Sequence, residues 1–160
     1  MTLSAVGLAL LKDLEGCRPL PYRDVAGLWS FGVGHLLTKS ELSSGKIVFM
    51  TPWEVVQYGR DPWPALWIEA LLQQDVVVID RALARLVRVP LTQHQEDALL
   101  CWTFNVGVEA LRTSTLRKKL NGKGYAEVPA EMRRWVHAGG QVIEGLGRRR
   151  EREAALWQRT

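Results

Sequence analysis

One long helical pattern limits how this chain can fold. From Ala65 onward, apolar residues recur at intervals of three and four, which is the spacing of one helix face: Ile68, Leu72, Val76, Ile79, Leu83 and Leu86. Pro90 ends the pattern, because proline lacks the backbone N–H that a helix needs. A helix of about 23 residues is about 35 Å long at about 1.5 Å per residue. This length exceeds the width of the core of one small lobe. We therefore expect a helix over 65–88 that can connect two lobes.

The segment before this helix is predicted to contain a turn and a short strand. Pro19 and Pro21 exclude a helix there, and 24–27 has the composition of a tight turn. Over 28–33, large apolar residues alternate with others, which is the period of a strand. We therefore expect the apolar side chains to share one buried face and Ser30 to look from the other face into a cleft.

The remaining elements are predicted to be mostly helical. Residues 47–64 contain three prolines and are predicted to be irregular. Helices are predicted over 3–15, 39–46, from Thr92 to about Gly107, from Thr113 or Ser114 to Asn121, from Pro129 to Ala138 and from about Leu146. Strands segregated from helices indicate an α+β fold. We expect one domain over 1–160, with a small lobe over 16–64, the linking helix over 65–88, and a helical lobe over 89–160 that includes the N-terminal helix.

Charge and composition restrict the function less strongly. The net charge is 21 − 17 = +4 and the pI is about 9.3, which favours polyanions such as nucleic acid, anionic lipid or the bacterial envelope, or serves only solubility. Cys17 and Cys101 form no metal-binding pattern and are predicted to be buried thiols. No run approaches the ~20 apolar residues of a membrane span, and no signal peptide is evident. We expect a monomer that is made in the cytoplasm.

Three residues on three local elements indicate a catalytic site. Glu15 ends the N-terminal helical pattern before Gly16, where the helix dipole disfavours an ionised carboxylate and so suits an acid that must hold its proton. Asp24 begins the predicted turn, and Ser30 lies in the predicted strand. An acid, a second carboxylate and a hydroxyl in this order point to glycosidic cleavage, which needs a proton for the leaving oxygen and a group that handles positive charge on the sugar.

The same residues resemble a known family. The order Glu15, Asp24, Ser30, followed by Gly-Val-Gly-His over 32–35, is similar to the phage-type lysozymes, or endolysins, of glycoside hydrolase family 24. Further stretches that resemble this family follow in the family's order over 34–40, 102–107, 114–116, 134–140 and 145–149. One departure is Ser30, where the family most often has threonine; serine keeps the hydroxyl and loses the restraint of a β-branched side chain.

The resemblance implies a fold and an activity. It implies a lysozyme-like fold in which a small lobe with a short antiparallel sheet and a larger helical lobe flank a cleft. It also implies hydrolysis, without a metal or cofactor, of the β-1,4 bond between N-acetylmuramic acid and N-acetylglucosamine in peptidoglycan. Glu15 would be the general acid. Asp24 with Ser30 would hold a water against the anomeric carbon, which we favour, or Asp24 would attack that carbon directly.

Other residues acquire roles through the same resemblance. Leu36, Phe104 and Thr115 match positions that touch sugar, although core packing or helix capping would also explain them. His35 is expected to pair with Asp75 on the long helix, in a supporting role rather than as a base or metal ligand. Finally, Arg148 and Arg149 are expected either to pair with Glu15 or to belong to a solvated basic helix face.

Alternative functions remain open at this stage. A lytic transglycosylase acts on the same polymer with an acid alone, so Asp24 and Ser30 argue against it. A wall-binding module without catalysis is an alternative from another class, whereas nucleic-acid binding would not explain the spacing of the three site residues. The basic C-terminal helix suggests contact with an anionic outer membrane. An endolysin would wait in the host cytoplasm until a membrane pore releases it to the periplasm.

Overall fold

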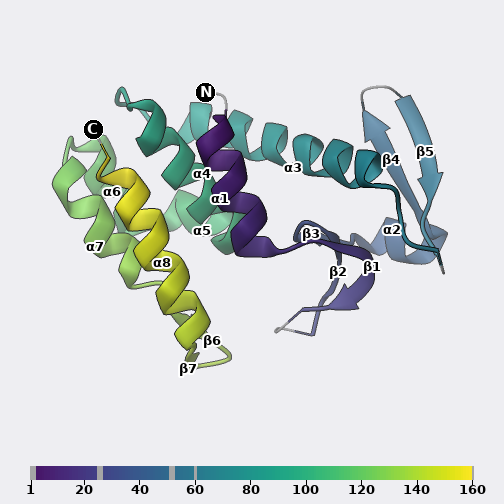
Figure 1. Cartoon of the computed structure of the whole chain (residues 1–160). Coiled ribbons are helices and arrows are strands. Elements are labelled where there is room, and N and C mark those ends of the chain that lie inside the picture. The colour runs from purple at the N-terminus through teal and green to yellow at the C-terminus, as the bar shows by residue number, and fades with distance from the viewer. Residues whose placement is uncertain (1–2, 25–26, 51–52, 60, 160) are drawn as a thin grey trace. The chain divides into compact units, whose positions relative to one another are not determined.

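The computed structural model describes residues 3–24, 27–50, 53–59 and 61–159. The chain divides into two compact units, and each is described by itself. The small unit is Glu15–Val77, and the helical unit combines Met1–Leu14 with Val78–Thr160. Figure 1 labels the elements of both. No helix among the described residues is both long and apolar enough to cross a bilayer.

Apart from the long helix and a short hairpin that is described below, the helical unit contains several helical elements among its described residues. They are α1 (Ala5–Glu15), α4 (Gln93–Val106), α5 (Val108–Thr113), α6 (Thr115–Asn121), a short 3-10 turn (Tyr125–Glu127), α7 (Val128–Arg133) and α8 (Glu144–Trp157). Helix α8 packs against α4 and α7, and Figure 1 shows it beside α7. The predicted capping box of Thr92 and Gln95 is present at the start of α4.

Close packing of α1 on α4 explains the burial of α1. Gly7 and Leu11 are the buried residues of α1. A Cβ on Gly7 would lie 2.6 Å from Cγ of Asp97, so only glycine fits without a shift. The fully buried Asp97 accepts hydrogen bonds from the backbone N–H of Ser4 at 2.9 Å and from its hydroxyl at 2.5 Å. This carboxylate therefore satisfies donors at the start of α1.

The helix predicted from Pro129 to Ala138 is wrong in its second half. Helix α7 ends at Arg133, and a hairpin of β6 (His137–Ala138) and β7 (Gln141–Val142) follows. Gly139 and Gly140 make its two-residue turn with φ of 58° and 78°. Two successive positive φ angles are the requirement of the hairpin turn that matches strand twist, so the glycine pair connects strands instead of ending a helix.

The small unit contains two small sheets and one short helix. Its elements are β1 (Arg18–Arg23), β2 (Trp29–Gly32), β3 (His35–Leu36), α2 (Lys39–Ser44), β4 (Lys46–Met50) and β5 (Trp53–Gln57). The first three strands form an antiparallel sheet in the order β1-β2-β3, and β4 pairs with β5. The predicted long helix is confirmed as α3 (Ala65–Leu86), whose residues through Val77 belong to this unit.

The prediction that 47–64 is irregular is wrong, because this stretch begins with the β4–β5 hairpin. Ile47 and Phe49 are buried, whereas Val48 and Met50 are exposed, which is the alternation of a strand with one covered face. Aromatic rings then fill the core of the unit. The rings of Phe31 and Trp63 meet edge to face, with their centroids 4.7 Å apart.

The expected burial pattern of 28–33 is wrong at Trp29 and Ser30. Trp29 is 38% exposed, whereas Ser30 is only 4% exposed and Phe31 is fully buried. The alternation of directions holds, and Phe31 and Val33 are buried as expected, with Trp63 packed on Phe31. Arg23 instead lies over the exposed Trp29 ring, 4.8 Å from its centroid.

Candidate active site

Glu15 lies where the sequence predicted it, at the last position of α1. Gly16 follows with φ of 68°, a left-handed conformation that ends a helix and that glycine adopts without strain. The Glu15 side chain is half-buried, and its Oε1 atom is shielded from solvent. The helix end therefore holds this carboxyl group partly out of water in the small unit.

The turn that follows β1 holds the Asp24 side chain in one orientation. The backbone N–H of Asp24 donates to Leu28 O, and Gly27 N–H donates to Asp24 O, both at 2.9 Å. Leu28 N–H also donates to Asp24 Oδ1 at 2.8 Å, so one carboxylate oxygen is tied to the turn. The predicted turn over 24–27 is consistent with these bonds, and its residues 25 and 26 lie outside the described residues.

Ser30 occupies the centre of a cross-strand row on the three-stranded sheet. It pairs with Tyr22 of β1 on one side and with Leu36 of β3 on the other. Directly opposed residues of antiparallel strands project from the same face, so Tyr22, Ser30 and Leu36 share one face of this sheet. Leu36 is 51% exposed at one end of the row. Two predicted site residues are thus neighbours, and Tyr22 is a third member that the sequence analysis missed.

Both candidate carboxylates act on the phenol of Tyr22. Burial raises the pKa of the Tyr22 phenol, and the charges of Glu15 and Asp24 raise it further, while Arg18 acts in the opposite direction. Glu15, Tyr22, Asp24 and Ser30 all belong to the small unit.

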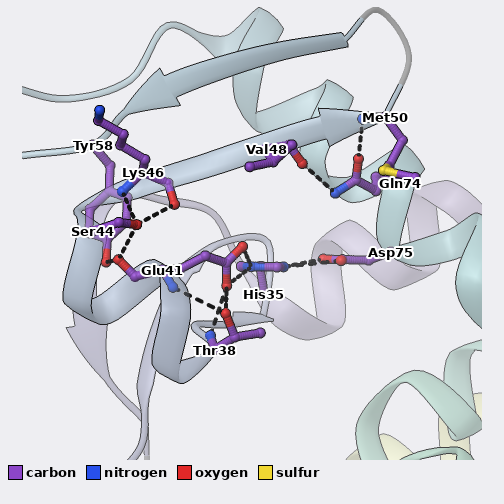
Figure 2. Close-up of polar contacts among 10 residues, drawn as sticks. All are labelled: His35, Thr38, Glu41, Ser44, Lys46, Val48, Met50, Tyr58, Gln74 and Asp75. Atoms are coloured by element: carbon purple, nitrogen blue, oxygen red, sulfur yellow. Dashed lines mark hydrogen bonds and ion pairs between the residues drawn. The ribbon is translucent and has the colours of Figure 1, made fainter.

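The predicted contact between His35 and Asp75 is present. Nδ1 of His35 lies 2.9 and 3.0 Å from the two carboxylate oxygens of Asp75 on α3. On the other side of the ring, Nε2 lies 3.4 Å from the carboxylate of Glu41 on α2. Figure 2 shows the imidazole between the two carboxylates. One ring thus connects β3, α2 and α3 inside the small unit.

Glu41 was missed as a partner of this histidine, although its local role could be read from the sequence. Thr38 caps α2, and the Glu41 side chain accepts from the Thr38 backbone N–H at 2.8 Å and from its hydroxyl at 2.7 Å. Thr-Lys-Ser-Glu has the spacing of a capping box. The cap fixes the carboxylate that faces His35.

The two carboxylates favour the protonated form of His35. Burial by itself would lower the pKa of His35, but the hydrogen bond and charge of Asp75, together with Glu41, outweigh burial and raise that pKa. The imidazolium form has an N–H on each nitrogen and can donate to both carboxylates. The side chain is 10% exposed, so these interactions are only partly screened by water.

Gln74, next to Asp75 on α3, anchors the hairpin in a similar way. Its side-chain oxygen accepts from Met50 N–H at 2.9 Å, and its amide nitrogen donates to Val48 O at 3.2 Å. Figure 2 shows Gln74 beside β4 and Asp75 beside His35. Two successive residues of α3 therefore hold the hairpin and the histidine.

Four other predicted site residues belong to the helical unit. Phe104 is half-buried on α4, and Thr115 is exposed at the first position of α6, whose N-cap is Ser114. Arg148 is exposed and pairs with Glu144, and Arg149 is 7% exposed. Their expected roles toward Glu15 and the sugar stay predictions.

The expectation of a solvated basic face on the C-terminal helix is wrong for two of its arginines. Arg149 and Arg150 are 7% and 1% exposed, and both pair with the fully buried Glu153. Arg149 also donates to Cys101 O at 3.1 Å, and Arg150 donates to Trp135 O at 2.9 Å. These side chains connect α8 to its neighbours because a guanidinium group can reach several acceptors at once.

The two cysteines differ from each other. Cys101 is buried, as predicted, and its thiol lies 3.6 Å from Gly7 O. Cys17 is exposed, so the prediction of a buried thiol is wrong there. The break of α1 at Gly16 carries Cys17 away from the packed helix.

Comparison with known proteins defines the family. The sequence profile described as phage lysozyme matches residues 12–153. The SAR-endolysin of Escherichia phage Mu is 40% identical over 147 residues, which cover 92% of this chain and 75% of that protein. The endolysin of Acyrthosiphon pisum secondary endosymbiont phage 1 is 34% identical over 162 residues and 99% of both chains. A crystal structure of a P22 lysozyme variant is 34% identical and has a TM-score of 0.77 over 99% of both chains.

The α+β fold and these similarities place the protein among glycoside hydrolases with a lysozyme-like fold. The chain belongs to the phage lysozyme family. It is an endolysin, a muramidase whose substrate is bacterial peptidoglycan.

Proposed function

We propose that Glu15 is the general acid of this muramidase and that Asp24 and Ser30 position the attacking water. In this mechanism Glu15 gives its proton to the glycosidic oxygen as the bond to the anomeric carbon breaks. Asp24 accepts a proton from the water while its charge stabilises the positive sugar ring. Ser30 adds a hydroxyl that can donate to or accept from that water. The product would have the inverted configuration.

The observation that carries this proposal is the grouping of the three residues on one small scaffold. The end of α1 presents Glu15, the turn after β1 orients Asp24 through Leu28 N–H, and the centre of the sheet presents Ser30. The phenol of Tyr22 interacts with both carboxylates. Two carboxyl groups beside one hydroxyl match the needs of glycoside hydrolysis.

Replacement of Glu15 tests the acid. Glu15→Gln keeps the size of the side chain but removes its transferable proton, so wall clearing should fall by at least about a hundredfold while sedimentation with purified walls is retained. Glu54→Gln is the matched control, because Glu54 lies on β5 of the same unit and is exposed. A Glu15→Gln protein that clears walls at the native rate would refute the assignment of Glu15 as the acid.

The departure at position 30 can be tested separately. Ser30→Thr keeps the hydroxyl and should retain activity, whereas Ser30→Ala should lower kcat by about tenfold or more, as expected for loss of one hydrogen bond in the transition state. Ser30 is buried, and the two variants differ in whether the side chain has a hydroxyl, so a difference in their activity would report on that hydroxyl. Native activity in Ser30→Ala would remove this residue from the mechanism.

Product analysis separates hydrolysis from transglycosylation and inversion from retention. We propose that the product carries a reducing end, whereas a lytic transglycosylase would leave an anhydro end, and mass spectrometry distinguishes the two. NMR of freshly released product would show the anomer first formed. An initially retained configuration would support direct attack by Asp24 in place of an activated water.

Substrate contacts outside the three catalytic candidates are also proposed. Leu36, Phe104 and Thr115 are proposed to touch the glycan, and Arg148 or Arg149 to support Glu15. The exposure of Leu36 and Thr115 is compatible with contact to a ligand. Alanine at each of these three positions should raise KM more than it lowers kcat, because such contacts bind ground state and transition state alike.

The place of action follows from the substrate. We propose that the protein is made in the host cytoplasm and reaches peptidoglycan in the periplasm after release through a membrane pore. The SAR-endolysin and endolysin relatives support an action on the bacterial wall. Expression in a bacterial host should therefore cause lysis only when a pore-forming protein or chloroform opens the inner membrane. Lysis without either treatment would contradict the requirement for a pore.

The structure argues against a contact between α8 and the outer membrane, because most of the helix's arginines are engaged within the protein. Arg149 and Arg150 are buried against Glu153, and Arg152 pairs with Asp13 at 2.6 Å. An amphipathic membrane-binding helix needs its cationic face in contact with lipid headgroups. This second activity stays an untested prediction, and leakage of anionic vesicles by the intact protein would be the evidence for it.

A further inference from the structure

A depression lined by aromatic residues lies in the small unit, where the chain passes from β5 to α3. Its volume is about 470 Å³, and its lining includes Tyr58, Trp63 and Trp67 together with the polar residues Gln57 and Asp61. Pockets that hold small ligands have volumes of about 300 to 1,000 Å³. The depression is therefore large enough to receive a ligand of the size of a sugar unit.

The depression is separate from the candidate catalytic residues. Trp63 in its lining packs edge to face on Phe31 of β2, and its backbone N–H donates to Pro19 O on β1 at 3.0 Å. Ser30 precedes Phe31 on β2, and successive side chains of a strand point to opposite faces of the sheet. Trp63 therefore packs on the face opposite to Ser30, and the proposed catalytic mechanism does not use this depression.

Hydrogen bonds and ring contacts hold the aromatic lining in place. The Tyr58 hydroxyl donates to Glu41 O at 2.8 Å. The indole N–H of Trp63 donates to Gln57 O at 3.2 Å, and the centroids of the Trp63 and Trp67 rings are 6.5 Å apart. A ligand that binds to rings already fixed in this way pays little for ordering them, which favours affinity.

We propose that this depression is a second glycan-binding site of the muramidase and that it holds an N-acetylglucosamine unit of the wall polymer. A pyranose ring has a face of C–H groups, and such a face packs well on the negative face of an aromatic ring. The hydroxyl and acetamido groups of the sugar need hydrogen-bond partners, and the exposed side chains of Gln57 and Asp61 can supply them.

The charge of Asp61 favours this sugar over the other one in the polymer. A carboxylate accepts hydrogen bonds from sugar hydroxyl groups, but it repels the carboxylate of an unsubstituted N-acetylmuramic acid unit. N-acetylglucosamine has no charge and is not repelled. The same residues thus select an uncharged acetylated sugar, which the substrate of this enzyme contains in every repeat.

A second site on the same polymer changes binding more than chemistry. While one sugar unit occupies the depression, the enzyme stays at a high effective concentration near the rest of the wall. Loss of the site should therefore raise KM for intact walls and leave kcat unchanged. This expectation does not depend on which residues catalyse hydrolysis.

An NMR titration of the native protein tests the site directly. The probe is a tetramer of N-acetylglucosamine, whose cleavage products would contain the same sugar. The indole N–H signals of Trp63 and Trp67 should shift in a saturable way as the tetramer is added. Binding at the catalytic residues alone would leave both signals unchanged, and that result would overturn the proposal.

The combined variant Gln57→Ala and Asp61→Ala removes the two polar side chains and keeps the aromatic rings. Both side chains are exposed, so the variant should fold, and thermal denaturation checks this. Its affinity for the tetramer should be about tenfold lower, because two hydrogen bonds are lost. Its KM for purified walls should rise about fivefold with the native kcat. A native KM in this variant would overturn the proposal.

Glu54→Ala is the matched control, because Glu54 is exposed on β5 but does not line the depression. It should keep the native affinity for the tetramer and the native KM. If the combined variant behaves as this control does, the proposal is overturned. Aromatic rings with a carboxylate can also bind an organic cation. Indole signals that respond to tetramethylammonium but not to the tetramer would therefore overturn the assignment of a sugar.

Discussion

The two units each contain an ionic cluster, and the clusters have opposite composition. In the small unit the imidazole of His35, which is a cation when protonated, lies between the carboxylates of Asp75 and Glu41. In the helical unit one carboxylate, Glu153, lies between two guanidinium groups, those of Arg149 and Arg150. The His35 cluster joins three elements, whereas the Glu153 cluster lies on α8 and reaches other elements through the bonds of Arg149 to Cys101 O and of Arg150 to Trp135 O.

The clusters differ in burial and in how they respond to pH. Glu153 is fully buried, whereas the side chains around His35 are 10 to 21% exposed. Arginine keeps its charge at any ordinary pH, but histidine loses its proton near neutrality. In the helical unit, the Glu153 cluster is therefore expected to stabilise the fold strongly and independently of pH. In the small unit, which holds the candidate site, the His35 cluster is expected to stabilise the fold less and to depend on pH.

The largest effect is expected at the buried carboxylate. Glu153→Ala leaves two arginines without this partner and should lower the free energy of unfolding by about 3–5 kcal/mol, as found when one member of a buried ion cluster is removed. The loss should be similar at pH 5.5 and pH 8.5, because both arginines stay charged. Urea denaturation at the two pH values measures it.

The matched control for this variant is Glu144→Ala. Glu144 also pairs with an arginine of α8, but both side chains are mostly exposed. Exposed pairs contribute little, so no clear change in unfolding is expected. If the two variants lost equal stability, burial would not be the property that distinguishes them.

A smaller and pH-dependent effect is expected at His35. His35→Asn should cost about 2 kcal/mol at pH 5.5, in the range for hydrogen bonds to charged groups. The folded protein raises the pKa of His35, so the stabilisation is fully present below the unfolded pKa of about 6.5 and is lost as pH rises through the folded pKa. The cost of the variant should therefore shrink at higher pH.

Urea denaturation at a series of pH values measures this trend. His137→Asn is the control, because His137 is exposed on β6 of the helical unit. A cost for His35→Asn that stayed constant from pH 5.5 to pH 9 would show that the ring contributes by packing and not by its charge.

The smallest effect separates the two carboxylates around His35. Asp75 contacts the ring at 2.9 Å and Glu41 at 3.4 Å, so Asp75→Asn should lower the pKa of His35 more than Glu41→Gln does. Both replacements keep the shape of the side chain, and glutamine can still accept at the Thr38 cap. NMR titration of the imidazole measures both pKa values. A larger fall in Glu41→Gln would reverse the proposed order of the partners.

Local signals in the sequence predicted the helical elements well. Helix α3, the cap at Thr92 and the end of α1 at Gly16 follow from apolar spacing, side-chain capping and glycine conformation, all of which are properties of short segments. The contact between His35 and Asp75 was expected only from family resemblance. Asp24 and Ser30 were located on the predicted turn and strand.

Features that depend on distant partners were missed. Strand β1 contains Pro19 and Pro21, which argue against a strand until its edge position is known. The burial of Arg150 requires Glu153 together with acceptors from other elements, and no local pattern reveals that arrangement. Tyr22 joined the candidate site only when strand pairing placed it opposite Ser30.

The prolines of β1 have a further consequence for how the small unit behaves in a crowded cell. An edge strand of a sheet has unpaired backbone N–H and C=O groups that can pair with a strand of another chain, which is a route to aggregation. Pro19 and Pro21 offer no N–H to an incoming strand, and the carbonyl of Pro19 already accepts from Trp63 N–H at 3.0 Å. The small unit thereby has, beside the candidate active site, a sheet edge that resists strand exchange between copies.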